Sequence, residues 1–235
     1  MNYIWTANLL VIRFPPRLKV PEFKLFASLL RMATKYGFSD VREQLLHSLE
    51  GAYPTKLEAY QTVTVLGEGI FGSPSPHPNA VLNLFLGQEV KFAIPLAAYR
   101  AALGGFSSLI SNEPGTILPR LTLAPVIHGI EVMRGGVSKF AFSTVCNMIA
   151  RGCRDERCLI NGNSGSTETG TQKLDRIYDA ICKEGKGDVF FPLSLSRTFC
   201  PSCAKLVKED YGDWCKKVWK VLPAILGVGK SWEEV

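Results

Sequence analysis

The sequence lacks several features that mark large classes of protein. No stretch reaches the roughly 18 uninterrupted apolar residues that a membrane-spanning helix requires. The apolar run near the N-terminus is short, has no positive charge ahead of it and carries no small-residue cleavage pattern, which excludes a signal peptide. The cysteine count is seven, an odd number, and a chain of 235 residues is large enough to fold without disulfides. We therefore expect an intracellular protein, in the cytoplasm or nucleus, with no membrane association.

The sequence also lacks a group of residues that would form an active site. Gly67, Gly69 and Gly72 have the G-x-G-x-x-G spacing that brings backbone N–H groups close to phosphates. The prolines within residues 74–78 exclude the helix that a dinucleotide site needs directly after its glycines. The lysine and aspartate motifs of a protein kinase are missing as well. We interpret this stretch as a loop between helices and expect no enzymatic activity.

The charge balance is only mildly basic. The chain has 27 basic and 21 acidic residues, a net charge of +6 and a pI near 8.9. These charges are scattered through the sequence, a pattern typical of a solvated surface, and they argue against nucleic-acid binding. Hydrophobic residues make up 46% of the chain and the mean hydropathy is +0.09, which indicates a globular protein with a packed core.

The strongest local pattern runs from Leu25 to Tyr53 and predicts two helices with a short break between them. A helix with apolar residues on most of its circumference must be buried on nearly all sides. Gly37 is placed to end the first helix in a left-handed conformation. Asp40, followed by Glu43, predicts an N-cap and its capping partner for the second helix. The first helix has two apolar faces, one with Phe23, Phe26, Leu30 and Ala33, the other with Leu25, Leu29, Met32 and Tyr36.

Further helices are predicted between this pair and residue 150. Pro95 marks either a kink or the first turn of a new helix. Cys146 falls on the apolar side of the last of these helices, near Phe142, and we expect a packed core thiol. A face of small residues should let another helix approach closely; it consists of Ile94, Ala97, Ala98, Ala101 and Ala102. The predicted helices span residues 56–63, 79–86, 90–103, 121–133 and 137–150.

The composition shifts after residue 150. Residues 161–172 are polar, lack an apolar period and are typical of a flexible loop or linker. Apolar residues within 174–182 predict a short helix, and a last helix starts at Cys200, with Pro201 at a favourable first position. The last helix has lysines largely outside an apolar stripe that consists of Val207, Tyr211, Trp214, Val218 and Leu222.

Four cysteines form the group with metal-binding spacing. Cys200 and Cys203 have the C-x-x-C spacing with which two thiolates bind one zinc ion, and Cys153 and Cys158 could supply a second pair. Such a site would tie the first loop of the C-terminal segment to the start of its last helix, as structural zinc does in small, weakly packed units. The alternative is that Cys200 only caps the helix. A redox role is disfavoured, because a thioredoxin-like fold places its C-x-x-C motif between a strand and a helix, and the preceding strand is missing here.

Several separated blocks resemble one family. The string LFASLLRMATKYGFSDVREQLLHSLEGAYP resembles the end of the BTB (POZ) domain in a group of fungal BTB-domain proteins. Further blocks follow in the same order: LGEGIFGSPSPHPNAVLNLF, Pro95 with its small-residue helix, FCPSC, and VWKVLPAILGVGKSWEE. The resemblance covers most of the chain from about Val20 onward, and similar fungal proteins have comparable cysteine pairs in this region.

The resemblance implies a mainly α fold. A helical array would follow a truncated BTB-like end, with a smaller cysteine-containing helical segment at the C-terminus. We divide the chain into an extended N-terminal remnant with a short strand (1–20), a helical BTB-end and post-BTB region (21–150), and the cysteine-containing segment (151–235). A BTB domain begins with roughly a hundred residues of sheet and helix that carry its dimer face. Most of that part is missing, so BTB-type homodimerisation is not expected.

The function that this resemblance implies is that of a non-enzymatic adaptor that binds protein partners. In the wider family such proteins serve cullin-type ubiquitin ligases and transcriptional repressors, and the resemblance does not choose between them. The alternative is a zinc-stabilised nucleic-acid-binding protein that uses the lysine face of the last helix. Its affinity would fall steeply with salt.

Overall fold

The computed structural model describes residues 22–66, 71, 75–111, 113–151, 153, 172, 175, 188–190 and 199–235. Across these residues the protein is mainly helical and has no β-strand, which confirms the predicted fold class. The predicted N-terminal remnant, residues 1–20, lies outside them. The division between residues 21–150 and 151–235 stays a prediction.

Most of the described helices lie in the first half of the chain. They are α1 (Phe23–Tyr36), α2 (Ser39–Glu50), α3 (Leu57–Leu66), α4 (Pro78–Gly87), the 3-10 helix η1 (Lys91–Ala93), α5 (Ile94–Leu103), α6 (Gly105–Leu109), α7 (Arg120–Arg151), α9 (Pro201–Lys220) and α10 (Leu222–Ile225).

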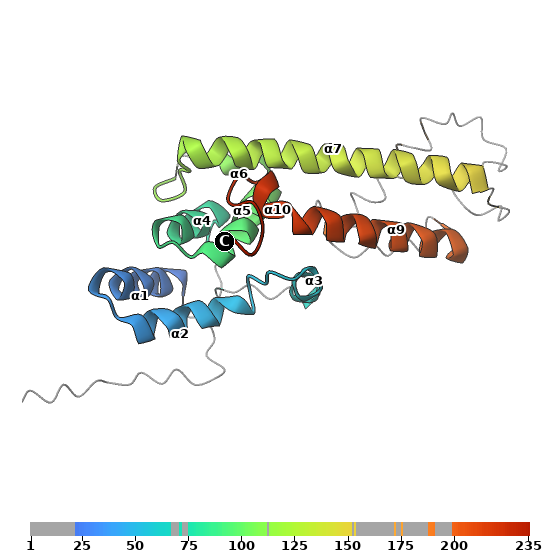
Figure 1. The fold of residues 1–235 in the computed structure, drawn as a ribbon. Coiled ribbons are helices and arrows are strands. Elements are labelled where there is room, and N and C mark those ends of the chain that lie inside the picture. The colour runs from blue at the N-terminus through green and yellow to red at the C-terminus, as the bar shows by residue number, and fades with distance from the viewer. Residues whose placement is uncertain are drawn as a thin grey trace, which may run out of the picture.

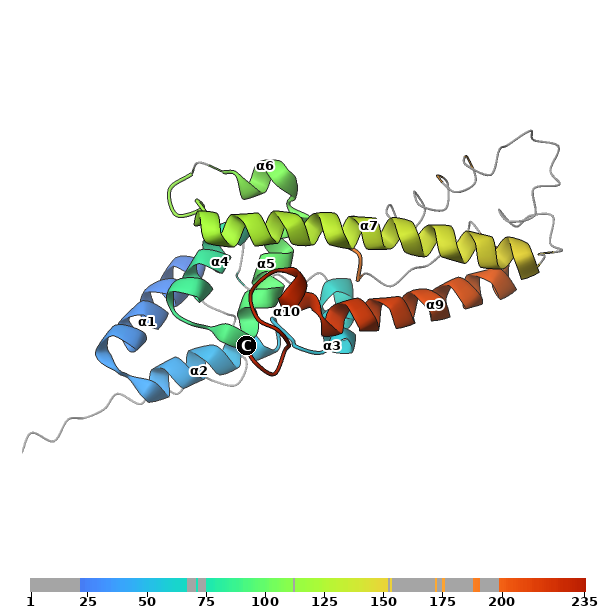
Figure 2. The same cartoon turned by 45° about the horizontal axis from the view of Figure 1, so that its top comes forward.

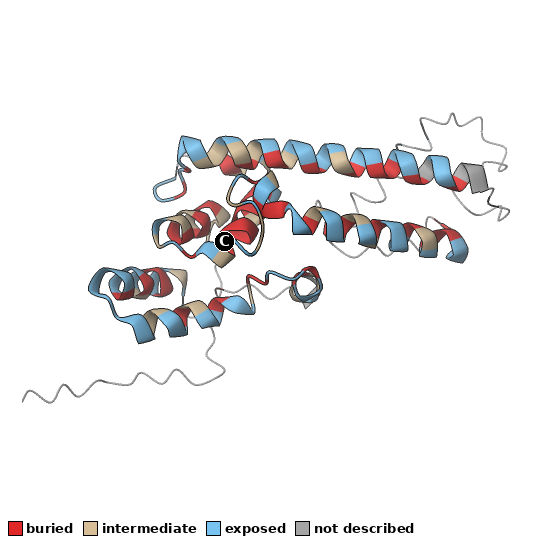
Figure 3. Cartoon of the chain, viewed as in Figure 1, coloured by how far each residue is buried: buried red, intermediate tan, exposed pale blue. Residues whose placement is uncertain are grey.

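Two long helices, α7 and α9, lie side by side and run in opposite directions (Figure 1). Helices α4 and α5 pack together, and α5 also contacts α7. The α1–α2 hairpin lies beyond α4, at the edge of the molecule (Figure 2). The short helix α10 folds back from the end of α9 onto α7. In Figure 3 the buried residues of α7 lie along the side that faces α4, α5 and α9.

The α1–α2 hairpin forms largely as its sequence predicts. Helix α1 ends at Gly37, whose positive φ of 68° is the left-handed conformation that glycine adopts easily. The predicted cap of α2 is wrong, because the helix begins two residues earlier. Phe38 is the N-cap, its carbonyl accepts the Arg42 N–H at 3.0 Å, and Asp40 lies inside the first turn.

Helix α5 is deeply buried, with most of its residues in the core. Pro95 lies in its first turn, after η1, so the start of a new helix is the alternative that the structure adopts. Small side chains let α4 and α7 approach α5 closely, which accounts for the central position of this helix. Every residue of the predicted small-residue face is buried: Ile94, Ala97, Ala98, Ala101 and Ala102.

The two helices predicted over residues 121–133 and 137–150 are one continuous helix, α7, so this prediction is wrong. Glycines at a helix centre favour a break, because glycine loses more conformational freedom than other residues. In α7 they instead allow close contact. A Cβ atom on Gly129 would lie 2.8 Å from Leu226 Cδ2, and one on Gly136 would lie 3.2 Å from Trp214 Cζ2.

Cys146 and Phe142 lie on the outer side of α7, so the prediction of a core thiol is also wrong. Phe142 is 58% exposed and Cys146 is exposed. The buried side of the helix passes through Phe140, Thr144 and Met148 at intervals of four residues. Residues 142 and 146 fall between these positions and therefore point to the opposite side.

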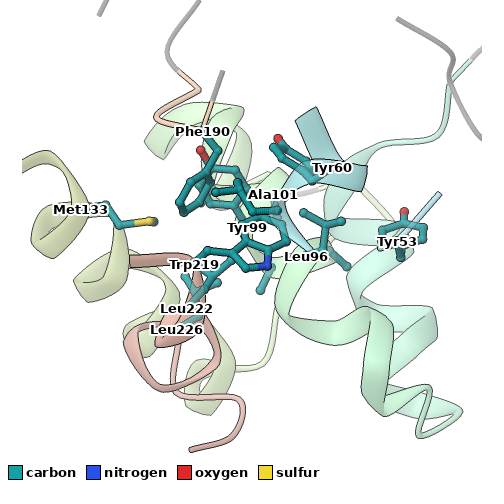
Figure 4. Packing of buried hydrophobic residues seen from close by; sticks show 14 of the residues in the cluster. Tyr53, Tyr60, Leu96, Tyr99, Ala101, Met133, Phe190, Trp219, Leu222 and Leu226 are labelled. Atoms are coloured by element: carbon teal, nitrogen blue, oxygen red, sulfur yellow. The ribbon is translucent and has the colours of Figure 1, made fainter. Parts of the chain in front are cut away.

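The centre of the core is a group of aromatic rings from α3, α5, α9 and residues 188–190 (Figure 4). The ring centroid of Phe190 lies 5.0 Å from those of Tyr99 and Trp219, and the rings of Tyr60 and Trp219 are 5.1 Å apart. The indole N–H of Trp232 donates to the Trp219 carbonyl at 2.6 Å, and the two indoles stack. Segments far apart in the sequence are thereby joined at one point.

Candidate functional site

Three of the four predicted metal ligands come together where the far ends of α7 and α9 meet. Cys153 lies two residues after the end of α7 at Arg151, and Cys200 is the N-cap residue of α9. Cys203 lies in the first turn of α9, where its side chain is buried. Because the two helices are antiparallel, the end of one meets the start of the other.

The geometry of these thiols suits a metal ion. The sulfur atoms of Cys153 and Cys200 are 3.7 Å apart, and those of all three cysteines lie within 4.8 Å of one another. Sulfur ligands at about 2.3 Å from a tetrahedral zinc ion are about 3.8 Å from each other. The cluster could therefore hold a metal ion. Cys158, the fourth predicted ligand, lies outside the described residues, and its role stays a prediction.

The start of α9 adds electrostatic support to this cluster. The N-terminal end of a helix carries a partial positive charge, and its first N–H groups lack partners inside the helix. Cys200 and Cys203 lie at this end. Negative charge on their sulfur atoms, the form in which cysteine binds metals, is therefore stabilised there.

A second group of chemically notable residues surrounds Asp188 in the core. The Tyr60 hydroxyl donates to Asp188 Oδ2 at 2.5 Å, and the Tyr99 hydroxyl donates to Oδ1 at 2.6 Å. The Phe190 N–H also donates to Oδ1, at 2.9 Å, and the Val189 N–H donates to the Tyr99 hydroxyl at 3.0 Å. The role of Asp188 could not be predicted, because the sequence around it has no distinguishing pattern.

Burial changes the acidity of the groups around Asp188. It raises the pKa of the Tyr99 hydroxyl well above its ordinary value, and the neighbouring Asp188 carboxylate adds to this rise. It also raises the pKa of the Cys215 thiol to about 12, against an opposing hydrogen bond with Tyr211. A thiol with so high a pKa is protonated at neutral pH and is a poor nucleophile. This arrangement attaches residues 188–190 to the core.

One of the three histidines has a structural role that the sequence did not reveal. His77 is the N-cap of α4, and its Nδ1 accepts the Asn79 N–H at 3.2 Å. Its Nε2 lies 3.2 Å from the Ser108 hydroxyl oxygen. Of the described residues that could bind a metal together, only the cysteine cluster forms a group.

Helix α1 exposes much of its second apolar face, which was predicted to be buried. Phe26, Leu30 and Ala33 are buried as predicted. Leu25, Met32 and Tyr36, on the second face, are 54, 53 and 59% exposed, and Phe38 beside them is 55% exposed. The expectation that α1 is covered on nearly all sides is therefore wrong for the described part of the chain.

Helix α9 carries its lysines on the outside, as predicted, but acidic residues lie among them. Lys205 Nζ is 3.9 Å from Glu209 Oε1, and Lys216 Nζ is 3.5 Å from Asp213 Oδ1. Both pairs are well exposed, so each contributes little to stability. The positive charge of this face is partly neutralised along its length.

A scan against protein-family models and searches of curated proteins and solved structures returned no match to this chain. The likeness to BTB-domain proteins therefore stays a prediction from the sequence. Among the described helices, none combines the length and the apolar character needed to cross a lipid bilayer.

Proposed function

We propose that the protein is a non-enzymatic protein–protein interaction module of the adaptor type found among fungal BTB-domain proteins. The observation that carries this proposal is the second apolar face of α1, where three large side chains are each more than half exposed. An ordered helix that packs one apolar face in the core and offers another to solvent is typical of a protein-binding surface.

The thiol cluster has a structural role in this proposal. Zinc is the metal that best fits closely spaced cysteine sulfurs in a closed site. Bound by Cys153, Cys200 and Cys203, and by Cys158 if it reaches the site, the ion would fasten the end of α7 to the start of α9. Metal content of the purified protein tests this: about one zinc ion per chain is expected in the wild type, and loss of zinc in Cys203→Ser. Wild-type protein without zinc under saturating conditions would contradict it.

The interaction function is tested by affinity capture of the tagged chain from a lysate of its own source, with and without nuclease. We expect a specific protein partner to stay bound after nuclease treatment. Retention of nucleic acid alone, lost on nuclease treatment or at modest salt, would contradict the proposal. That result would instead favour the zinc-stabilised nucleic-acid-binding alternative.

The charge distribution on α9 gives less support to that alternative. A helix that binds phosphates presents an uninterrupted positive face. The five lysines of α9 share its surface with Glu209, Asp210 and Asp213, and two of these acids lie close to lysines. A chain whose main basic helix is interrupted in this way suits a solvated surface better than a nucleic-acid interface.

A further inference from the structure

We propose that the exposed face of α1 binds one amphipathic helix whose polar edge is acidic. This inference rests on the proposed function and names the class of partner. The apolar stripe, defined here as Leu25, Leu29, Met32 and Tyr36, has spacings of four, three and four residues. Leu29 is half-buried against the core, and the other three side chains are more than half exposed. Such spacing is that of the seam along which two helices pack. At 1.5 Å per residue it extends for about 16 Å, the length of three helical turns.

A row of basic residues borders the apolar stripe along its whole length. Lys24, Arg31 and Lys35 each precede a residue of the stripe, and all three are exposed. No ion pair joins them to an acidic side chain within the described residues. Lys35 Nζ instead lies 5.3 Å from the centre of the Tyr36 ring. An acidic edge on a bound helix would complement these charges.

The same charges disfavour a second copy of the chain as the occupant. In a symmetric dimer with antiparallel α1 helices, the apolar stripes would meet and the basic rows of both copies would lie close together. Like charges at such a seam are destabilising. An acidic helix has no such conflict, because its carboxylates would meet the basic row directly.

An anionic membrane surface is also a poorer fit than a helix. The stripe is one residue wide, whereas a bilayer contacts a broad face. Helix α2 packs against α1 and exposes Asp40, Glu43 and Glu50. These carboxylates add negative charge to the α1–α2 hairpin, which an anionic bilayer would repel. A single helix bound along the stripe need not contact them.

The test uses three synthetic helical peptides with the same leucine seam, which differ only in flanking residues: glutamate, glutamine or lysine. Binding to the full chain is measured by fluorescence anisotropy. We expect the glutamate peptide to bind best and the glutamine peptide to bind about tenfold more weakly. Salt should weaken binding of the glutamate peptide most.

The Met32→Gln variant of the chain should lose most of its binding to the glutamate peptide. Leu121→Gln, at a side chain that is 91% exposed on α7, is the matched control and should leave binding unchanged.

A charge exchange makes the test specific. In the double variant Arg31→Glu and Lys35→Glu, we expect the lysine peptide to bind best and the glutamate peptide to lose its affinity. Both positions are exposed, so the variant should keep the wild-type circular dichroism spectrum and melting temperature. Equal binding of all three peptides to the wild type would overturn the role of charge.

Three other outcomes would overturn the inference. The first is no binding of the glutamate peptide at about 1 mM, where even a weak specific complex is detected. The second is binding to phosphatidylserine vesicles that Met32→Gln abolishes, when no peptide binds. The third is a dimer in sedimentation that Met32→Gln dissociates. If a partner captured from lysate survives nuclease and also binds Met32→Gln, this inference fails while the proposed function stands.

Discussion

Two regions of the α7–α9 pair differ in the interactions that they contain. One is the middle of the pair, around Tyr211 and Cys215. The other is its far end, at Cys153, Cys200 and Cys203. In the middle, Tyr211 and Cys215 of α9 donate hydrogen bonds to the Val189 carbonyl, and aromatic rings close the space around it. At the far end, within the described residues, three sulfur atoms face one another instead. Hydrogen bonds and ring contacts therefore hold the middle, whereas the far end brings together sulfur atoms that could hold a metal ion.

The largest effect should follow from removing the carboxylate that organises the middle. Asp188→Ala deletes the acceptor of two tyrosine hydroxyls and of the Phe190 N–H, and leaves these donors buried. We expect the free energy of unfolding to fall by about 5 kcal/mol, because each lost bond to a charged group and each unsatisfied donor is costly. Urea denaturation measures the loss.

The control for Asp188→Ala is Asp213→Ala, at a side chain that is 71% exposed on α9. Its effect should be within about 0.5 kcal/mol of zero. A loss below about 1 kcal/mol in Asp188→Ala would mean that ring packing holds the middle without the carboxylate.

The next largest effect should come from alkaline pH, which should lower the free energy of unfolding through the middle of the helix pair. Burial raises the pKa of the Cys215 thiol from 9.0 to about 12, so the thiol stays protonated in the folded protein while it ionises in the unfolded chain. Its contribution to stability is complete below pH 9 and is lost between pH 9 and about 12. The full loss is roughly 4 kcal/mol at the top of this window.

Unfolding free energies measured across this pH window test the alkaline prediction. Tyr53 and Tyr99, whose pKa values are also raised by burial, should add to the fall above pH 10. Cys215→Ala should make the fall shallower between pH 9 and 10, because the ordinary pKa of a thiol, 9.0, lies below the 10.0 of a tyrosine. An identical slope in the variant would show that Cys215 does not contribute.

The far end should respond to metal where the middle does not. Zinc at about a hundred times its dissociation constant should stabilise the protein by about 3 kcal/mol. Cys203→Ser should abolish this gain, whereas Cys146→Ser, at an exposed thiol outside the cluster, should keep it. Thermal melts with zinc or with a chelator measure both.

Hydrogen exchange can locate the effect of zinc within the helix pair. Protection should rise at the amides around Met148 and Cys203 and stay unchanged around Trp219. A uniform rise along α9 would remove the distinction between the two regions, because it would mean that the far end and the middle unfold together.

Much of the fold follows from local patterns in the sequence. The left-handed cap at Gly37, the first turn of α5 with Pro95 and the start of α9 at Pro201 each depend on the backbone preference of one residue. The cysteine cluster was found from spacing, because C-x-x-C places two thiols on one helical turn. That Cys153 reaches them depends on the antiparallel packing of α7 on α9.

Other features depend on tertiary contacts that no local pattern encodes. Asp188 has three donors from segments as far as 128 residues away in the sequence, so nothing near it in the chain marks its role. The apolar character of α1 predicted burial, but only the fold determines which of its two faces the core covers. The single helix α7, predicted as two helices, likewise depends on tertiary contacts, such as the close approach of Leu226 to Gly129.

The glycines in the central part of α7 provide the last and smallest test. In Gly129→Ala the new methyl group would lie 2.8 Å from Leu226 Cδ2 and 2.9 Å from the Ile225 carbonyl oxygen, so α10 must shift. We expect a loss of about 2 kcal/mol in urea denaturation, typical of overpacking. Gly135→Ala, which meets nothing within 4 Å, should instead gain about 0.5 to 1 kcal/mol from helix propensity. If both substitutions stabilise the protein equally, α10 is not packed tightly, and the contrast with a metal-dependent far end loses its basis.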